Sequence, residues 1–268
     1  MSDEGEFQQL LSKIATERQF HCQHYKEKCL RRRIGVRLRA RGLQSYSDYA
    51  RLLDGDAREY EKLLDTLTIN VTKLFRNWET WDAIGTHVIP AIWRDTPREV
   101  KVWSAGCSSG EEPYSLAVLF HRHASTVREA HRLNRLDILG TDIDRESLIA
   151  AARGSFDDDA FTDTPAEIRA SYFSATAPAA VRPDVKNLVR FERRDLIHGD
   201  APKGLNLIAC RNVIIYFDRA TQEQLFVEFH DALQPGGYLV LGKVETLLGA
   251  TRSLFEPVDA RERIFRRR

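Results

Sequence analysis

The chain contains 268 residues, of which 43% are hydrophobic and 29% are charged, and its formal net charge is +1. This length accommodates one large or two modest domains, and the composition is typical of a soluble globular protein. No stretch approaches the ~18 apolar residues of a membrane span and no signal peptide is visible, so we expect a soluble, cytoplasmic protein with no membrane insertion.

The sequence predicts neither disulfide bonds nor a bound metal ion. The chain has four cysteines, Cys22, Cys29, Cys107 and Cys210. They form no CxxC pair and lack the spacing of a small disulfide-bonded domain, which indicates reduced thiols. Although His21 and His24 lie close to Cys22 and Cys29, the spacing matches no zinc pattern, so we expect no metal.

The first part of the chain is predicted to be a small helical domain over residues 1–70. Apolar residues recur at helical spacing from Glu6 to about Leu67. The second predicted helix is strongly basic and contains Lys26, Lys28, Arg31, Arg32, Arg33, Arg37, Arg39 and Arg41. These eight cations, beside the single Glu27, would repel one another without an anionic partner.

We therefore expect this helix to bind a partner, which could be an acidic protein helix or nucleic acid. The residues expected to make the contact are Arg31, Arg32, Arg33 and Arg37. The alternative is a solvated helix face beside an apolar stripe.

The segment 68–77 links the helical part to an α/β part. Asn70 and Thr72 carry short hydrogen-bonding side chains, and Arg76 carries a planar cation that can clamp a carboxylate. Spacing alone does not separate this segment from a surface linker. A helix over about 78–93 is expected next.

Residues 100–117 predict a buried strand, a glycine-bounded turn and a helix start. Gly106 and Gly110 let the backbone turn tightly and approach a ligand closely. The sequence matches neither GxxxxGK[ST] nor GxGxxG, and Glu111 and Glu112 would repel a phosphate. A nucleoside without phosphate fits better, and S-adenosylmethionine is the obvious candidate. An ordinary α/β turn remains the alternative.

A second strand over 136–142 ends in Asp142, whose carboxylate can bind both hydroxyls of a ribose. Asp144 can instead cap the helix that follows. Periodicity weakens between residues 154 and 187, where irregular structure with a small β excursion is expected. Strands near 188–196, 205–217, 238–242 and 263–265, with a helix over 221–233, then predict a doubly wound, largely parallel sheet over residues 71–268.

Five segments together resemble the chemotaxis receptor glutamate O-methyltransferase (CheR) family. They are Asn70–Arg76, Trp103–Ser115, Thr141–Asp144, Cys210–Phe217 and Gly237–Gly242. They occur in the family's order and span nearly the whole chain. The resemblance implies a small helical domain followed by a Rossmann-like methyltransferase domain that uses S-adenosylmethionine and releases S-adenosylhomocysteine.

The resemblance also implies which residues form the site. Those expected to contact the cofactor are Asn70, Thr72, Arg76, Gly106, Glu112, Asp142, Asp195, Leu196, Asn212 and Val213. The family usually has Asn-Leu-Leu where this chain has Asp195-Leu196-Ile197; aspartate can accept from an adenine amino group but cannot donate. At the start of the fourth strand, Asn206 stands where the family often has Asp.

The implied reaction needs no general base, because a glutamate acceptor with a pKa near 4.3 is already ionised at neutral pH. Arg76 is expected to orient the acceptor carboxylate, and Tyr216 to add a hydroxyl contact. The implied partners are the methylation helices of chemoreceptors, bound by a cytoplasmic monomer at receptor clusters on the inner face of the membrane.

Two other functions stay open. One is a nucleic-acid methyltransferase, although Cys210–Val213 lacks the Asn-Pro-Pro-Tyr-like strand end of base methylation, so no nucleic acid is expected. The other is a cofactor-binding scaffold without catalysis.

Overall fold

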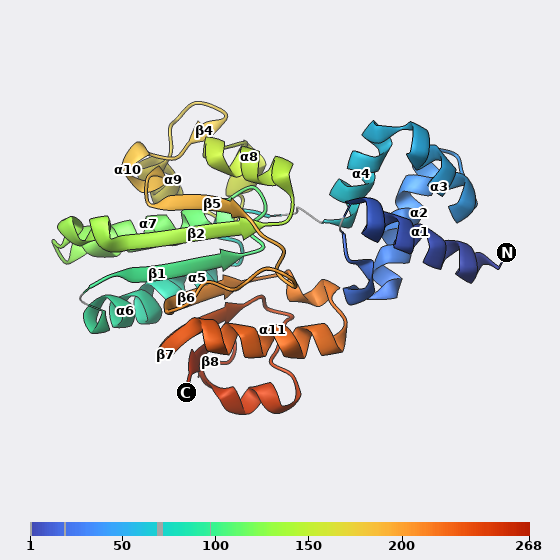
Figure 1. Cartoon of the computed structure of the whole chain (residues 1–268). Coiled ribbons are helices and arrows are strands. Elements are labelled where there is room, and N and C mark those ends of the chain that lie inside the picture. Colours follow the sequence, from blue (N-terminus) through green and yellow to red (C-terminus); the bar gives the residue numbers. More distant parts are fainter. Residues whose placement is uncertain (1, 19, 69–71, 97) are drawn as a thin grey trace. The chain divides into compact units, whose positions relative to one another are not determined.

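The computed structural model describes residues 2–18, 20–68, 72–96 and 98–268 (Figure 1). Its contacts divide the chain into two compact units. One consists of residues 1–69 together with 216–221, and the other of residues 70–215 and 222–268. The second unit therefore contains the whole sheet, and the first contains the N-terminal helices.

The first unit is helical, as the sequence predicts. Its helices are α1 (Asp3–Arg18), α2 (Glu27–Ala40), α3 (Tyr46–Gly55) and α4 (Ala57–Leu67), with a 3₁₀ turn at Cys22–His24. Ser45 caps α3 by accepting the Asp48 N–H, and Asp56 caps α4 by accepting the Glu59 N–H. The apolar faces of the helices form a core around fully buried Phe7, Ile34 and Tyr49.

A short segment from late in the chain completes this helical unit. Tyr216 accepts a hydrogen bond at its carbonyl oxygen from the Lys26 N–H at 2.9 Å, and Asp218 donates its N–H to the His24 carbonyl at 2.9 Å. Phe217 forms an isolated antiparallel bridge with Tyr25, and their ring centroids lie 5.0 Å apart. Residues 216–221 are thus built into the helical unit.

The second unit is built on a seven-stranded sheet. Its strands are β1 (Val100–Ala105), β2 (Leu136–Asp142), β5 (Val189–Arg193), β6 (Leu205–Cys210), β7 (Leu233–Leu241), β8 (Phe255–Asp259) and β9 (Ile264–Arg267). Their order is β5-β2-β1-β6-β7-β9-β8, visible from top to bottom in Figure 1 for the first five. Pairings among the first five are parallel, and β9 is antiparallel to both neighbours.

Helices cover both faces of this sheet, which confirms the predicted doubly wound architecture. Alternate residues of β1 point to opposite faces. Val102 joins a core with α5 (Trp78–Ala83), α6 (Ile89–Asp95) and α7 (Glu111–Thr126). Trp103 joins a separate core with Phe226 and Phe229 of α11 (Arg219–Ala232). Because β1 is buried on both faces, it reads as a nearly continuous apolar run.

The predicted β excursion is confirmed and is small. After α8 (Arg145–Arg153), β3 (Ser155–Phe156) pairs with β4 (Ala179–Ala180) in a two-stranded antiparallel ribbon. Helix α9 (Ala166–Tyr172) lies between the two strands in sequence, and α10 (Pro183–Lys186) follows them.

Three local predictions differ from the structure. The helix over 78–93 is interrupted by a π-helical turn at Ile84–Val88 between α5 and α6. Strand β7 begins at Leu233, so the strand predicted near 238–242 is longer and includes Pro235-Gly236-Gly237. Strand β8 was not predicted, because its exposed Glu256 and Pro257 weaken the apolar pattern. Among the described residues, no helix has the length and apolarity required to cross a bilayer.

Candidate functional site

The loop after β1 is shaped for close approach by a ligand. Gly106 and Gly110 have φ values of +77° and +94°, which glycine adopts readily. The N–H groups of Gly106 and Cys107 donate to the Thr141 carbonyl at the end of β2, at 2.8 and 2.9 Å. A Cβ at Gly106 would lie 2.6 Å from Val213. The loop is therefore held against both neighbouring strands.

Asp142 stands at the carboxyl end of β2 and is held by backbone donors. Its Oδ2 accepts the Ser108 N–H at 2.8 Å, and its Oδ1 accepts the Asp144 N–H at 3.0 Å. Burial raises its pKa, and these two donors limit the rise. A carboxylate has about four acceptor positions, so Asp142 can still accept from two hydroxyl groups. Asp144 caps α8, as predicted, by accepting the Glu146 N–H.

Glu112, in the first turn of α7, is a buried carboxylate next to a buried cation. Its Oε1 accepts from the Ser104 hydroxyl at 2.9 Å, and its Oε2 lies 4.0 Å from Nη1 of Arg211. Burial raises the pKa of Glu112 to about 7, and Arg211 is the main group that opposes this rise. Glu112 therefore changes charge within the physiological pH range.

Arg76 lies on a loop whose backbone is fixed on both sides. Phe75 and Asn77 both have positive φ values, of 53° and 61°. The Phe75 N–H donates to the Ser115 hydroxyl at 2.9 Å, and the Asn77 N–H donates to Oδ2 of Asp163 at 2.9 Å. A non-glycine residue in this region costs roughly 1–2 kcal/mol. The surrounding contacts thus hold the two residues that flank Arg76 in conformations that the free chain would rarely adopt.

Asn212 and Val213 follow β6, and a residue that the sequence did not reveal holds them in place. Asn212 has a φ of 61°, and its Oδ1 is buried with no hydrogen-bond partner among the described residues. The carboxylate of Glu245, only 3% exposed, accepts the N–H groups of Asn212, Gly242 and Ile215 at 2.9, 2.6 and 3.3 Å. Burial raises its pKa, and these donors oppose the rise.

The remaining predicted site residues lie in different surroundings. Asp195, after β5, accepts the Ile197 N–H at Oδ1, and Leu196 packs against the α11 core. Tyr216 belongs to the helical unit, where the Arg33 guanidinium lies 4.5 Å from its ring centroid. Asn70 lies outside the described residues. The roles assigned to these residues therefore stay predictions.

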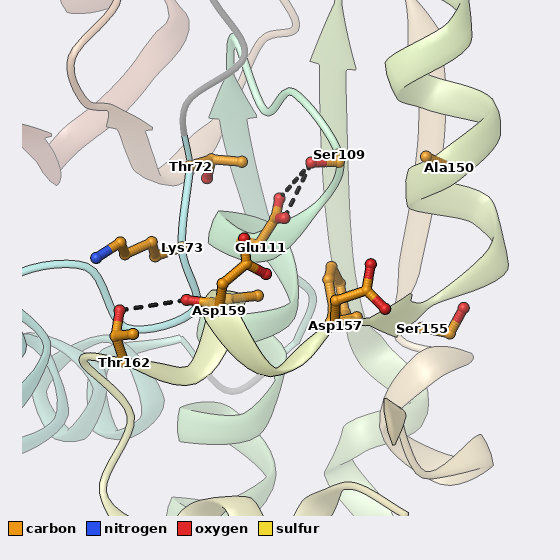
Figure 2. Close-up of a pocket in the computed structure, with 11 residues that line it drawn as sticks. Thr72, Lys73, Ser109, Glu111, Ala150, Ser155, Asp157, Asp159 and Thr162 are labelled. Atoms are coloured by element: carbon orange, nitrogen blue, oxygen red, sulfur yellow. Dashed lines mark hydrogen bonds between the residues drawn. The ribbon is translucent and has the colours of Figure 1, made fainter. Parts of the chain in front are cut away.

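A pocket of about 500 Å³ opens beside the loop that follows β1 (Figure 2). Of the predicted cofactor residues, Thr72 lines it. Glu111, Asp157 and Asp159 contribute carboxylates, while Lys73 contributes a cation. Glu111 is buried and accepts from the Ser109 hydroxyl at 2.9 Å, and burial raises its pKa. The pocket is thus acidic, which disfavours a polyanionic ligand.

The premise that the basic residues of α2 lack anionic neighbours is wrong for part of the helix. Arg31 pairs with Glu4 and Glu27, and Arg37 donates to both oxygens of the buried Glu59 at 2.9 and 2.7 Å. Arg33 is 6% exposed and donates to the Leu67 carbonyl, so it cannot meet a partner without rearrangement.

A narrower basic surface remains on α2. Lys28, Arg32 and Arg39 are exposed and recur at helical spacing, and the structure gives them no ion pair with any described residue. We call these three residues the basic stripe. Of the four predicted contact residues, only Arg32 belongs to it.

Two family models match the chain. The model described as "CheR methyltransferase, all-alpha domain" matches residues 5–68, and the one described as "CheR methyltransferase, SAM binding domain" matches residues 70–264. A chemotaxis protein methyltransferase of Listeria innocua is 34% identical over 84% of this chain and 83% of its own length.

Two further curated proteins are similar. A chemotaxis protein methyltransferase of Borreliella burgdorferi is 30% identical and covers 81% of this chain and 79% of its own length. The putative methyltransferase Cher3 of Pseudomonas putida is 31% identical over 98% of this chain and 96% of its own length.

Proposed function

The chain belongs to the CheR methyltransferase family, and we propose that it methylates glutamate side chains of chemoreceptors to form methyl esters. It is an S-adenosylmethionine-dependent methyltransferase that acts in chemotaxis. The observation that carries the finer proposal is the tightly held Arg76, a cation whose charge acts on Glu112 in the buried site.

The residues at the strand ends fit the cofactor. Its ribose hydroxyls need acceptors, which Asp142 offers, and its ammonium group needs an anion, which Glu112 offers. The hydroxyl of Ser108 and Oδ1 of Asn212 are buried and have no hydrogen-bond partner among the described residues. Buried polar atoms are rarely left unpaired, so these two suit a polar ligand. Val213 lies against Gly106, where only a residue without a Cβ fits.

The chain's own residues then have to position the acceptor carboxylate beside the methyl group and to exclude water. When bound, S-adenosylmethionine supplies a methyl group on a sulfonium, which an anionic nucleophile can attack. Arg76 holds the acceptor carboxylate by charge-assisted hydrogen bonds, and Tyr216 adds a hydroxyl contact. No proton has to be removed from an ionised glutamate, so positioning and desolvation carry the rate enhancement.

The two other functions are less well supported. The acidic pocket beside the loop would repel a nucleic-acid backbone, and the exposed basic stripe is short. A scaffold without catalysis would have no need to hold Arg76 between two left-handed residues. These features favour an enzyme that acts on a protein.

We further propose the organisation in which this activity works. The helical domain spans residues 1–70 and is completed by residues 216–221, and the methyltransferase domain is formed by the rest of residues 71–268. The enzyme acts as a cytoplasmic monomer at receptor clusters and uses the basic stripe to meet the acidic methylation helices.

The proposal is tested with labelled S-adenosylmethionine and membranes that contain chemoreceptors. Carboxyl methyl esters hydrolyse in alkali, so labelled methanol should be released when the labelled membranes are made alkaline. Receptors whose acceptor glutamates are changed to alanine should release none. Methylation that survives alkali would contradict a glutamate ester and would direct attention to a nitrogen acceptor.

Cofactor binding should depend on pH near neutrality. Glu112 has a pKa of about 7 in the free protein and must be ionised to pair with the cofactor's ammonium group. The affinity for S-adenosylhomocysteine should therefore rise with pH up to about 7 and level off above it. Below that, it should fall by up to about tenfold per pH unit. Titration calorimetry across this range measures the midpoint, and a flat profile would contradict the pairing.

Reversing two of the three charges of the basic stripe should weaken receptor binding without changing cofactor binding. The double change Lys28→Glu and Arg32→Glu turns attraction for an acidic helix into repulsion and should raise the receptor KM by roughly tenfold. Arg58→Glu with Lys62→Glu makes the same charge change at the same spacing on α4 and serves as the control. Affinity for S-adenosylhomocysteine should stay unchanged in both variants. Equal KM values in the two would remove the basic stripe from the receptor interface.

A further inference from the structure

Arg211, the first residue after β6, is placed to act on two parts of the site at once. We infer that Arg211 is a positioning residue that fixes the loop carrying Arg76 and keeps Glu112 ionised for the cofactor's ammonium group. This inference rests on the proposed roles of Arg76 and Glu112. Arg211 itself is expected to touch neither substrate nor cofactor.

The contacts of Arg211 run in two directions. Its Nη2 donates to the Arg76 carbonyl at 2.7 Å and lies 3.4 Å from Oδ1 of Asn77. Its Nη1 lies 4.0 Å from Oε2 of Glu112. The two ends of one rigid, planar guanidinium thus reach the Arg76 loop and the Glu112 carboxylate. A point charge on a flexible stem could neutralise Glu112 but could not hold both groups in a fixed geometry.

Trp81 locks this guanidinium in place. The guanidinium carbon of Arg211 lies 5.0 Å from the Trp81 ring centroid, and the indole Nε1–H donates to the same Arg76 carbonyl at 3.0 Å. That carbonyl therefore accepts two hydrogen bonds, one from each partner of the stacked pair. Both partners thus hold Arg76 through its backbone carbonyl.

Burying the charged Arg211 side chain at this position is energetically unfavourable. It is 7% exposed, and its Nε has no hydrogen-bond partner among the described residues. Burial lowers its pKa, yet arginine stays protonated in proteins. A buried cation needs a nearby anion, and Glu112 is the first group that opposes the effect of burial on Arg211. The two groups therefore depend on each other.

The charge of Glu112 is set by a small number of groups. Arg211 and Arg76 favour the carboxylate, as does the hydrogen bond from Ser104, whereas burial and the carboxylate of Glu245 oppose it. The buried thiols of Cys107 and Cys210 also face Glu112, and burial keeps both thiols protonated by raising their pKa values. Removing Arg211 would take away the strongest of the favourable groups and would leave Glu112 mostly protonated at neutral pH.

The test measures S-adenosylhomocysteine binding by calorimetry as a function of pH, with no receptor present. In Arg211→Gln, the pH midpoint for binding should move upward by about 1 unit or more, so that affinity at pH 7 falls roughly tenfold and recovers at higher pH. In Glu112→Gln the pH dependence should vanish, and adding Arg211→Gln to it should cause little further loss of affinity.

Arg211→Lys separates the two parts of the inference. It keeps the charge, so the pH midpoint should remain near the wild-type value, but it loses the planar fork, so kcat for methyl transfer should fall about tenfold with the affinity preserved. This variant also serves if Arg211→Gln does not fold. A wild-type midpoint in Arg211→Gln, or a shifted midpoint in Arg211→Lys, would overturn the inference. Binding is measured without an acceptor, so these results hold even if the acceptor is not a receptor glutamate.

Discussion

Replacing Arg76 by alanine should abolish methyl transfer. The acceptor carboxylate would lose the cation that orients it, and well-aligned reacting groups can account for roughly 7–11 kcal/mol of a barrier. Cofactor affinity should fall only modestly, because Asp142 and the pair of Glu112 with Arg211 remain. The Arg76 loop should keep its shape, since its hydrogen bonds run through the backbone of Phe75, Arg76 and Asn77.

Single-turnover methyl transfer and S-adenosylhomocysteine calorimetry on the same preparation check this expectation. Arg98→Ala removes an exposed arginine outside the site and should leave both measurements unchanged. Arg76→Lys keeps the charge without the bidentate geometry and should retain a small part of the rate. Full turnover in Arg76→Ala would remove this residue from the catalytic residues.

Replacing Glu245 by alanine should impair both stability and cofactor binding. Three backbone N–H groups, those of Asn212, Gly242 and Ile215, would lose their common acceptor in a buried place. Each unsatisfied donor costs about 1–3 kcal/mol, partly offset because the buried charge is removed as well. We expect the free energy of unfolding to fall by about 3 kcal/mol in total. The left-handed conformation of Asn212 would relax, and affinity for S-adenosylhomocysteine should fall at least about tenfold.

Thermal unfolding with and without S-adenosylhomocysteine measures the two effects separately. Glu99→Ala removes an exposed glutamate and should change neither the melting temperature nor the stabilisation by ligand. Glu245→Gln should be less damaging than Glu245→Ala, because its amide oxygen can still accept from the Asn212 and Gly242 N–H groups, whereas its amide nitrogen cannot accept from the Ile215 N–H. A normal affinity in a destabilised Glu245→Ala would limit Glu245 to a purely structural role.

The sequence predicts best what is encoded locally. The Gly106 turn and the acidic end of β2 are short patterns whose geometry follows from neighbouring residues, and the structure confirms the positive φ values of Gly106 and Gly110 and the Asp144 cap of α8. The alternation of strands and helices likewise predicts the sheet. Such features need no knowledge of distant contacts.

Long-range pairings are what the sequence could not reveal. Glu245 supports Asn212 across 33 positions, and Arg211 reaches Arg76 across 135. The same limit explains the basic helix, because Glu59, which pairs with Arg37, is 22 positions away and no periodicity connects them. A charge run therefore indicates a binding surface only after its intramolecular partners are known.

The short stretch 216–221 has a consequence for how the protein can be divided. It follows Asn212 and Val213 in sequence but supplies Phe217 and the Asp218 N–H to the helical unit. The helical unit is therefore discontinuous in sequence. A fragment that ends at residue 69 would lack part of its own packing, and a transplant of this unit onto another enzyme would have to carry the six-residue stretch with it.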